Sequence, residues 1–492
     1  MIKTPILIIG AGPTGLMLSA QLHRYGAPHV IVDLKDGITE LSKALGVQAR
    51  TLEQYRQLGI ADAALSEGFI ARNVRFVVKG RTRAQIQFGE IGGDLSPYPY
   101  LFILEQSRNE ALLHDYISAR GGKVQWSSEV VDLKKHDAGY TGTIRRGDGR
   151  EEAFECRYLI GCGGAHSAVR HLLEMPFKGE TNEQLFFVAD MNIELEMEKQ
   201  GLLLAINKKE FLAFFPMSGE NQYRVIGILP PTVEDPHDFP FEVLKTHVDE
   251  VLDIPAQITG HSWYSGYRVH HRIVDTFRNG NAFLAGDAAH IHSPAGGQGM
   301  NTGLGDAVNL GWKLAAVVNG WYDEKILDSY NEERRPFGVQ LVRTTDQAFT
   351  VIVSPSTTAR LFRTYLLPVI LSVMLKFEPL RRFMFKTISQ TRITYRGSSL
   401  TDGSRSGTLH SGDRFPWFEW EGGNSFDWLS DSGYVVLRFG EAGGMEIPDW
   451  SGPVVQIAVA GAAADAAERA GFPRNGVVIV RPDMHIAKLI AG

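Results

Sequence analysis

Apolar residues in the first part of the chain occur in short runs that end at glycine or at an acidic residue. Residues 5–9 form one run and lead into Gly10, and helix-like sequence follows to about Tyr25. A second run, residues 29–32, ends in Asp33. Short apolar runs bounded by turn residues predict buried strands, and a strand, a glycine turn and a helix in succession predict one unit of a parallel sheet.

The same order of strand, glycine turn and helix occurs twice more. Residues 158–161 run into a Gly-Gly pair, and residues 282–285 run into Gly286 and Asp287, after which a glycine-rich loop leads to helix-like sequence near Asn301. Glycines let a backbone approach a flat ligand, and a helix N-terminus offers unpaired N–H groups. We expect the three junctions to converge on one elongated, planar ligand. A glycine-rich surface turn is the alternative for any single junction.

Between the second and third junctions the pattern changes to strands of period two. Segments such as residues 186–193 and 210–217 predict an antiparallel sheet with an aromatic-rich face across residues 177–267. Such a face is more often core than binding site. Its place between two ligand-binding stretches nevertheless makes it the best candidate for a substrate cover.

These patterns predict an α/β protein of three domains, since 492 residues exceed what one core usually supports. A Rossmann-like domain is expected from residues 1–175 and 268–395, with a short β insertion near residues 72–100. The β-sheet domain of residues 176–267 interrupts it. A Gly- and Ser-rich linker from residue 398 leads to a separate region, residues 399–492.

Composition narrows the class of function. The 50 basic and 56 acidic residues give a net charge of −6, which provides no basic surface for nucleic acid. Cys156 and Cys162 fit a reducing cytosol better than a disulfide scaffold, and the N-terminus lacks the features of a signal peptide, so we expect a cytoplasmic protein. The longest apolar run, residues 365–375, is shorter than the about 20 residues that a membrane span needs. It predicts a buried or a partner-facing helix; a homodimer is left open.

The N-terminal motif has the spacing of a dinucleotide-binding fingerprint, Gly10-Ala-Gly12-Pro13-Thr14-Gly15. The first two glycines permit a tight turn and close approach to a pyrophosphate, and the third lets the helix pack on the strand. Asp33, at the end of the second strand, is placed to bind ribose hydroxyls. Further along, Lys43 could neutralise the negative charge of a diphosphate. Gln106 and Arg108 lie at the N-terminus of an expected helix, where ligand contacts are common.

Three motifs in this order resemble a known family. They are Gly10-x-Gly12-x-x-Gly15, the middle Gly-rich motif that ends in Ser167 to Arg170, and Gly286-Asp287 followed by Ser-Pro-x-Gly-Gly-Gln-Gly-Met-Asn-Thr-Gly. Together they look like the fingerprints of the class A flavin-dependent aromatic hydroxylases, the group of p-hydroxybenzoate hydroxylase and phenol hydroxylase. The resemblance covers residues 1 to about 395. The tail looks similar to the thioredoxin-like C-terminal domain of the phenol hydroxylase and polyketide hydroxylase branches.

The resemblance implies that FAD lies extended across the three motifs. Adenosine would lie at Asp33, the pyrophosphate along Gly12 to Gly15 and Asp287, and the isoalloxazine beneath Pro294 to Asn301. The residues that it implies for cofactor binding are Gly10, Gly12, Pro13, Thr14, Gly15, Asp33, Lys43, Gln106, Arg108, Gly286, Asp287, Pro294, Gly297, Gly299, Met300 and Asn301.

The resemblance also implies a reaction. NAD(P)H would reduce FAD, O2 would add to the flavin, and the flavin hydroperoxide would deliver one oxygen atom to an electron-rich aromatic substrate. Protein groups need only orient and desolvate the reactants, and the helix N-terminus at Asn301 would stabilise negative charge on the reduced flavin. No metal is expected, because His290 and His292 belong to the glycine-rich loop between Asp287 and Asn301 that would carry the isoalloxazine. We call this segment the flavin loop. Tyr267, which would hold the phenolic oxygen, and Pro294 are the catalytic candidates.

Two positions depart from the family pattern. The middle motif usually has Asp-Gly where this chain has Gly163-Gly164, so a carboxylate associated with FAD and NAD(P)H handling is missing. Members that act on simple phenols often have an acid where this chain has Leu45, which disfavours a simple phenol. We therefore predict an FAD-dependent monooxygenase that hydroxylates a phenolic or polycyclic compound. The alternative is an FAD-binding flavoprotein that NAD(P)H reduces poorly and that is oxidase-like or does not hydroxylate. A third interpretation is a protein that serves only as an interaction module, which would require the three glycine motifs to have arisen by chance.

Overall fold

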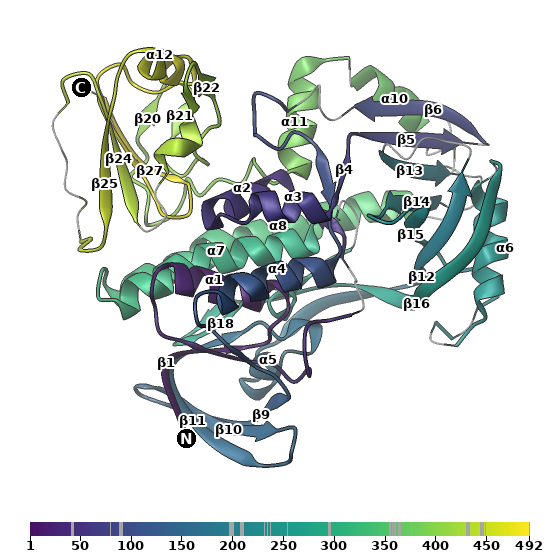
Figure 1. Ribbon diagram of the computed structural model, residues 1–492, viewed down its shortest axis with the longest axis horizontal. Helices are drawn as coiled ribbons and strands as arrows, with labels where there is room; N and C mark the ends of the chain where they lie inside the picture. The colour runs from purple at the N-terminus through teal and green to yellow at the C-terminus, as the bar shows by residue number, and fades with distance from the viewer. Residues whose placement is uncertain are drawn as a thin grey trace.

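The computed structural model describes the chain except for residues 41–43, 79, 88–91, 196–200, 207–210, 231, 234, 237, 253, 294–296, 354–355, 357, 359–360, 363–365, 375, 430–432, 443–446, 448 and 492. Three bodies follow one another along the long axis of the molecule (Figure 1). A central α/β body carries the N-terminus, a second sheet lies at one end, and a smaller C-terminal body lies at the other end.

The sheet of the central body is mainly parallel, and its order is β17-β18-β11-β1-β2-β8, with β9 and β10 added at β11. Its strands are β1 (Ile2–Ile9), β2 (Val30–Val32), β8 (Val124–Gln125), β9 (Ser128–His136), β10 (Gly139–Arg146), β11 (Glu151–Gly161), β17 (Arg278–Asn279) and β18 (Ala282–Leu284). The apolar runs predicted from the sequence form its middle strands, which are buried because helices cover them.

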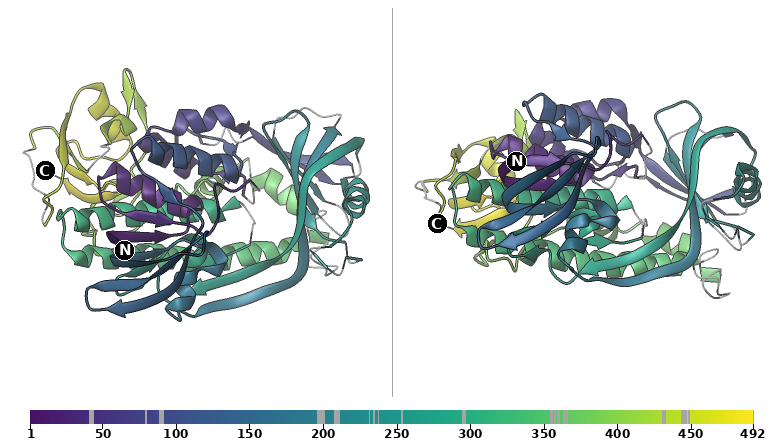
Figure 2. Two further views of the ribbon diagram at one scale, coloured as in Figure 1. Left: turned by 60° about the horizontal axis from the view of Figure 1, so that its bottom comes forward. Right: turned by 90° about the horizontal axis from the view of Figure 1, so that it is seen from below.

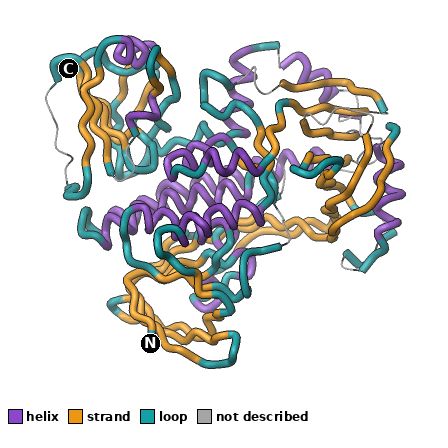
Figure 3. Tube along the Cα trace, viewed as in Figure 1, coloured by secondary structure: helices purple, strands orange, loops and turns teal. Residues whose placement is uncertain are grey.

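Helices form a layer over this sheet, as Figure 3 shows. They are α1 (Pro13–Arg24), α2 (Ala49–Leu58), α3 (Ala61–Glu67), α4 (Gln106–Ser118), α5 (Ala168–Leu172), α7 (Gly299–Val318) and α8 (Asp328–Val353), with the short 3-10 turns η1 (Gly164–His166), η2 (Gly286–Ala288) and η4 (Glu324–Leu327). A small sheet of β3 (Gly46–Val47), β7 (Leu101–Ile103) and β4 (Phe69–Ala71) lies beside them. Helix α7 is buried along almost its whole length, because α1 packs on one side of it and α8 on another.

The second sheet has eight strands in the order β19-β16-β12-β15-β14-β13-β5-β6. Their bounds are β5 (Asn73–Val78), β6 (Arg81–Gln87), β12 (Phe177–Leu195), β13 (Gly201–Ile206), β14 (Phe211–Pro216), β15 (Gln222–Ile228), β16 (Ala256–Val274) and β19 (His290–Ile291). Helix α6 (Phe241–Leu252) covers the face that points away from the central body (Figure 1). The predicted antiparallel sheet is therefore present. The hairpin β5–β6, expected as a short insertion, joins this sheet through parallel pairing of β5 with β13.

The remaining helices and the C-terminal body follow α8. Helices α10 (Leu367–Met374) and α11 (Glu378–Ile388) lead into the small ribbons β20 (Arg405–Ser406) with β21 (Leu409–His410) and β22 (Glu419–Trp420) with β23 (Gly423–Asn424), then the turn η6 (Ser425–Trp428). The C-terminal sheet has the order β25-β24-β26-β27, from β24 (Tyr434–Phe439), β25 (Val454–Val459), β26 (Gly476–Val480) and β27 (Ile486–Ala491), with α12 (Ala462–Arg469) between β25 and β26. Strands β24 and β25 are parallel, and β26 and β27 are antiparallel to their neighbours. The domain limits and the thioredoxin-like assignment stay predictions.

Candidate functional site

Four neighbouring parallel strands of the central sheet end at the same level. Ile9 of β1 is in register with Val32 of β2 and with Gly161 of β11, and Gly161 is in register with Leu284 of β18. The residues that follow these strand ends are the ones that the sequence singled out: Gly10, Asp33, the pair Gly163-Gly164, and Gly286-Asp287. In open α/β sheets, ligands bind at the carboxyl ends of the strands. The register of the four strands therefore brings all three glycine motifs to one edge of the central sheet.

The three glycines of the first motif differ in what surrounds them. A Cβ at Gly10 would lie 2.5 Å from the Cys162 backbone, and one at Gly15 would lie 1.8 Å from the Gly10 carbonyl oxygen. Both positions are closed by protein, and Gly10 also has a φ of +110°. A Cβ at Gly12, in contrast, has nothing within 4 Å. The open space lies at the N-terminus of α1, where Pro13 occupies the first turn, and this arrangement fits a bound pyrophosphate.

The two acidic candidates lie in different environments. Asp33 is 8% exposed and accepts hydrogen bonds from the backbone N–H groups of Ala11 and Lys35, so it also fixes the glycine turn. Asp287 is exposed at the turn η2. Thr14 fits between this turn and α7, since a Cβ at Gly286 would meet its hydroxyl oxygen at 2.5 Å and one at Gly303 at 2.3 Å. The first and third motifs are thus in direct contact.

The N-terminus of α7 faces the loop that the sequence assigned to the isoalloxazine. Gly297 has a φ of +63°, and Gly299 and Met300 begin the helix. The side chain of Asn301 donates to the carbonyls of Gly46 (2.8 Å) and Gly297 (2.9 Å) and accepts from the N–H of Gln48 (2.8 Å). Its amide therefore joins β3 to the flavin loop, and the backbone N–H groups of the first turn are the groups that remain to meet a ligand.

The remaining residues that the sequence assigned to cofactor binding lie in different surroundings. Gln106 lies at the start of α4 and accepts from the N–H of Ala44 (3.3 Å) and donates to Glu110 (2.9 Å). Arg108 lies at the surface, where it donates to Glu105 (2.7 Å). Lys43 and Pro294 lie outside the described residues.

The second sheet presents two different faces. Alternate residues of its strands point to α6 on the outer face and to the central body on the inner face. The outer-face residues are buried: Phe187, Ala189, Met191, Leu203, Leu212, Phe214 and Val225. Several inner-face residues are half-buried: Leu204, Phe211, Phe215, Ile226, Trp263, Ser265 and Tyr267.

Register arranges the inner face in rows. One row contains Tyr267, Phe186, Ile228 and Phe211, and the next contains Ser265, Val188, Ile226 and Ala213. These two rows are apolar apart from Ser265 and the Tyr267 hydroxyl, and they form one continuous surface. The following row, Trp263, Asp190, Arg224 and Phe215, contains an ion pair between Arg224 and Asp190 (2.6 Å).

Tyr267 is the polar group of the first row. Its ring lies 6.1 Å from that of Phe186, centroid to centroid, and it also packs against Ile228 and Val269. Burial raises the pKa of its hydroxyl above the ordinary value, so the group is neutral at pH 7 and able to donate one hydrogen bond.

The middle motif is held by an arginine that the sequence reasoning did not select as a site residue. Arg170 donates to the carbonyls of Ala165 and Ala288 (3.0 Å for the latter), and so ties η1 to η2. Gly163 has a φ of −78°, and a Cβ there would make only ordinary contacts, at 3.6 Å to Ser167 and 3.8 Å to Ile9. Gly164, with a φ of +70°, is the position that needs glycine.

Asp306 is another residue that was missed. Its carboxylate accepts from the N–H of Gly286 (2.9 Å), from His290 (2.8 Å) and from Arg334 (2.7 Å), and it is fully buried. A polar stripe within the otherwise apolar α7, namely Asp306, Asn309 and Lys313 at spacings of three and four, was the available signal for buried polar contacts.

Comparison with known proteins agrees with this geometry. Residues 3–345 match the family described as FAD binding domain. The 6-methylpretetramide 4-monooxygenase of Streptomyces rimosus is 31% identical over 98% of this chain and 90% of its own length. Among solved structures, the anhydrotetracycline hydroxylase OxyS from Streptomyces rimosus is 28% identical, with a TM-score of 0.78 over 100% of this chain and 96% of that one. The rebeccamycin biosynthetic enzyme RebC with reduced flavin is 26% identical, with a TM-score of 0.79 over 99% and 96%.

Two further findings concern the described residues alone. No helix among them is both long and apolar enough to cross a membrane. In the same part of the chain, no three His, Cys, Asp or Glu side chains gather in a way that could hold a metal ion.

Proposed function

Because this chain belongs to the FAD-binding family of flavin-dependent monooxygenases, we propose that it hydroxylates a polycyclic phenolic compound with NAD(P)H and O2. The observation that carries the proposal is the common level of four strand ends, which gathers the three motifs beside an open space at Gly12. FAD held there would supply the redox chemistry, namely reduction by NAD(P)H and activation of O2.

The residues at the strand ends have distinct roles in holding FAD. The first turn of α1 would receive the pyrophosphate, Asp33 the ribose of the adenosine, and the exposed carboxylate of Asp287 the region between pyrophosphate and ribityl chain. The N-terminus of α7 would face the isoalloxazine, where its N–H groups and partial positive charge stabilise negative charge on the ring.

The inner face of the second sheet is proposed as the substrate wall. Its half-buried apolar rows exclude water and hold the substrate by contact area, while Tyr267 donates a hydrogen bond to the oxygen of the ring to be hydroxylated. Two adjacent rows of this kind offer contact area along several strands, which favours a substrate of several fused rings over a simple phenol. The names of two relatives, 6-methylpretetramide 4-monooxygenase and anhydrotetracycline hydroxylase, support the same substrate class.

The experiment that tests this function is reduction and turnover of the purified yellow protein. Stopped-flow mixing with NADPH and with NADH should bleach the flavin without oxygen, faster when a suitable polycyclic phenol is present. Under an atmosphere of 18O2, the product should gain one 18O atom, as mass spectrometry measures. A flavin that neither nicotinamide bleaches, with any of a panel of tetracyclic and simple phenols, would contradict the proposal.

The role of Asp287 has its own test. Asp287→Ala should weaken FAD binding by about tenfold, as expected for loss of a charge-assisted contact, with little change in the thermal midpoint of the apoprotein. Asp275→Ala, another exposed carboxylate of the same domain, is the control. FAD content equal to that of the parent would remove Asp287 from the site.

We propose further that the protein acts in the cytoplasm as a homodimer. Both cysteines are free and buried, which suits a reducing compartment. Exposed apolar side chains gather on α10 and α11, including Val369, Val373, Phe377 and Phe383, and a second subunit would cover them. Light scattering after size-exclusion chromatography tests the dimer, and a monomer mass at micromolar concentration would contradict it.

A further inference from the structure

The C-terminal body contacts the central body through buried charges. Arg481 donates to both carboxylate oxygens of Glu333 (2.6 and 2.9 Å), and Arg50 of α2 donates to the carbonyl of Asp483 (2.8 Å). All of these side chains are almost completely buried. Burying charges costs desolvation, and apolar packing would hold two domains as well. The same interface also has apolar packing, where the rings of Tyr434 and Trp312 lie 6.0 Å apart, centroid to centroid. The buried charges therefore call for a role beyond attachment.

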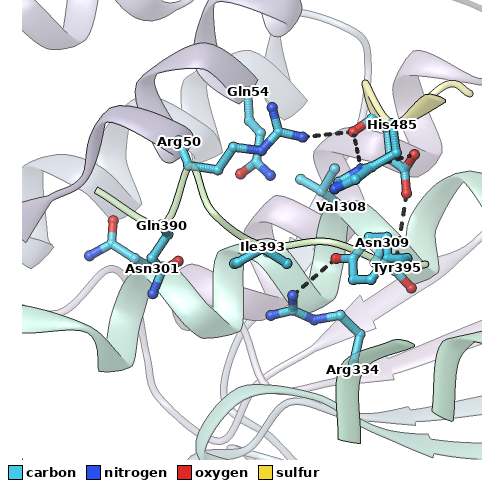
Figure 4. Close-up of a pocket in the computed structure, with 12 residues that line it drawn as sticks. Arg50, Gln54, Asn301, Val308, Asn309, Arg334, Gln390, Ile393, Tyr395 and His485 are labelled. Atoms are coloured by element: carbon cyan, nitrogen blue, oxygen red, sulfur yellow. Dashed lines mark hydrogen bonds and ion pairs between the residues drawn. The ribbon is translucent and has the colours of Figure 1, made fainter. Parts of the chain in front are cut away.

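A chain of contacts leads from this interface to the third motif. The ring of His485 lies 4.3 Å from that of Tyr395, centroid to centroid, and the Tyr395 hydroxyl accepts from Arg334 (3.1 Å). Arg334 donates to Asp306 (2.7 Å), and Asp306 accepts from the N–H of Gly286 (2.9 Å). We call these four side chains, His485, Tyr395, Arg334 and Asp306, the relay. Figure 4 shows its first three members around a narrow cavity.

The carboxylate of Asp306 has no freedom to turn. Burial alone would raise its pKa, but Arg334 and His290 outweigh burial and hold the pKa below the ordinary value, so the group is ionised at neutral pH. One oxygen accepts from Arg334, and the other accepts from Gly286 and His290. Arg334 is itself oriented by Tyr395 and by the carbonyl of Thr302 (3.1 Å). Hydrogen bonds therefore connect Tyr395 to the turn through Arg334 and Asp306.

A second route reaches the other wall of the flavin loop. Arg50, which is bonded to Asp483, lies in the first turn of α2 beside Thr51. Thr51 donates to the side chain of Asn301 (2.8 Å), the residue that joins β3 to the flavin loop. The cavity between the two routes is lined by residues of both bodies, among them Asn301 and His485. The loop that carries Asp483 and His485 is thus connected to Asp306 through Tyr395 and Arg334, and to Asn301 through Arg50 and Thr51.

We propose that the C-terminal domain is a positioning element of the FAD site: His485 and Tyr395, acting through Arg334 and Asp306, hold the Gly286–Ala288 turn in the geometry that receives the cofactor. The domain contains no cysteine, so it acts through position and not through thiol chemistry. These residues are positioning residues, since Asp306 reaches the cofactor only through the turn.

The test is the dissociation constant of FAD for the full-length apoprotein, measured by quenching of flavin fluorescence. Tyr395→Phe keeps the ring and removes only the acceptor of the Arg334 hydrogen bond. It should weaken FAD binding about tenfold, the low end of the effect expected for a hydrogen bond to a charged group. The matched control is Tyr434→Phe, a buried tyrosine of the same interface that packs on Trp312 and Trp450 outside the relay. The control should bind FAD as the parent does.

A double-mutant cycle separates positioning from general loosening. If both residues act on the turn through one chain, Tyr395→Phe should add little to the effect of Asp306→Asn on the FAD dissociation constant. Independent, additive losses would overturn the proposal, and so would FAD affinity of Tyr395→Phe within twofold of the parent.

If Asp306→Asn does not fold, His485→Phe takes its place in the cycle, since it keeps the contact with the Tyr395 ring. The rate of FAD release then serves as the second measurement. No substrate or nicotinamide is present in these experiments. Their outcome is therefore independent of whether the protein hydroxylates a polycyclic phenol.

Discussion

The two faces of the second sheet are built from the same alternating strands, yet they differ in what covers them. On the outer face, Phe214 packs under α6 and is fully buried. On the inner face, its neighbour Phe215 is only half-buried against the central body. Both are phenylalanines on one six-residue strand. Apolar pattern alone therefore does not distinguish a core from a binding wall; the partner layer decides.

The same contrast occurs within the first glycine motif. Gly10 and Gly15 are glycines because protein atoms lie against them, whereas Gly12 faces open space. In both regions, the closed position supports folding and the open position is available to a ligand. Substitutions of matched pairs can test this distinction.

The largest effect is expected at the glycines. Gly15→Val should prevent folding, because its Cβ would lie 1.8 Å from the Gly10 carbonyl oxygen. Gly12→Val should leave a folded protein whose FAD affinity falls on the order of 100-fold or more, because the side chain would fill the pyrophosphate space. Circular dichroism and FAD content measure the two outcomes. A Gly12→Val protein that retains FAD would break the comparison.

The next effect compares the two faces of the sheet directly. Phe214→Ala should lower the free energy of unfolding by about 3–5 kcal/mol, as for other buried aromatic residues. Phe215→Ala should cost less, about 1–2 kcal/mol, because its ring is only partly buried, and should also raise KM for the substrate. Denaturant titration and steady-state kinetics separate the two. Equal losses of stability would show that the inner face is core.

A smaller effect is expected at Tyr267. Tyr267→Phe removes a single hydrogen bond, worth about 0.5–1.5 kcal/mol, or about two- to tenfold in rate. Hydroxylation should fall more than flavin reduction, so more of the NAD(P)H consumed should appear as hydrogen peroxide. The ratio of product to NAD(P)H consumed measures this coupling, with Tyr264→Phe on the outer side of the same strand as the control. Unchanged coupling would leave orientation to the apolar wall alone.

The smallest effect concerns the second motif. Gly163 has an ordinary φ of −78° and room for a Cβ, so Gly163→Asp should fold normally. If the missing carboxylate limits hydride transfer, flavin reduction by NAD(P)H should accelerate about two- to fivefold, the scale of one exposed charge interaction. Stopped-flow reduction of the FAD-replete variant measures it. An unchanged rate would indicate that other groups supply what the carboxylate supplies elsewhere in the family.

Local pattern was sufficient to predict the strand ends and their glycines, because the tight turn at Gly10 and the acid after β2 are properties of a few adjacent residues. It was also sufficient for the antiparallel character of the second sheet. It did not reveal that β5 pairs with β13, since these strands are more than one hundred residues apart in the chain. Neither strand's sequence indicates which other strand it pairs with. The role of Asn301 shows the same limit: its position was predicted, but not its bonds to Gly46 and Gln48.

The docking of the C-terminal domain was likewise beyond reach from the sequence. Arg481 and Glu333 are separated by 148 positions, and each alone is an ordinary charged residue in a polar segment. Their pairing depends on how two folded surfaces meet. Lys43 and Pro294 stay predictions, as do the ligand contacts of Asp33, Gln106 and Arg108.

Among the described residues, the chain passes between the second sheet and the central body on two sides of that sheet. The long strands β12 and β16 rise from the central body on one side, where β16 also pairs with β19 next to the flavin loop, and β5 continues from β4 on the other side (Figure 2). The sheet is therefore held on two sides, unlike a flap that moves on one hinge. Moving the sheet away from the central body would strain both sides at once, so we do not expect the sheet to open as a lid. Engineering for larger substrates should accordingly change side chains of the inner face and leave β12, β16 and β5 in place.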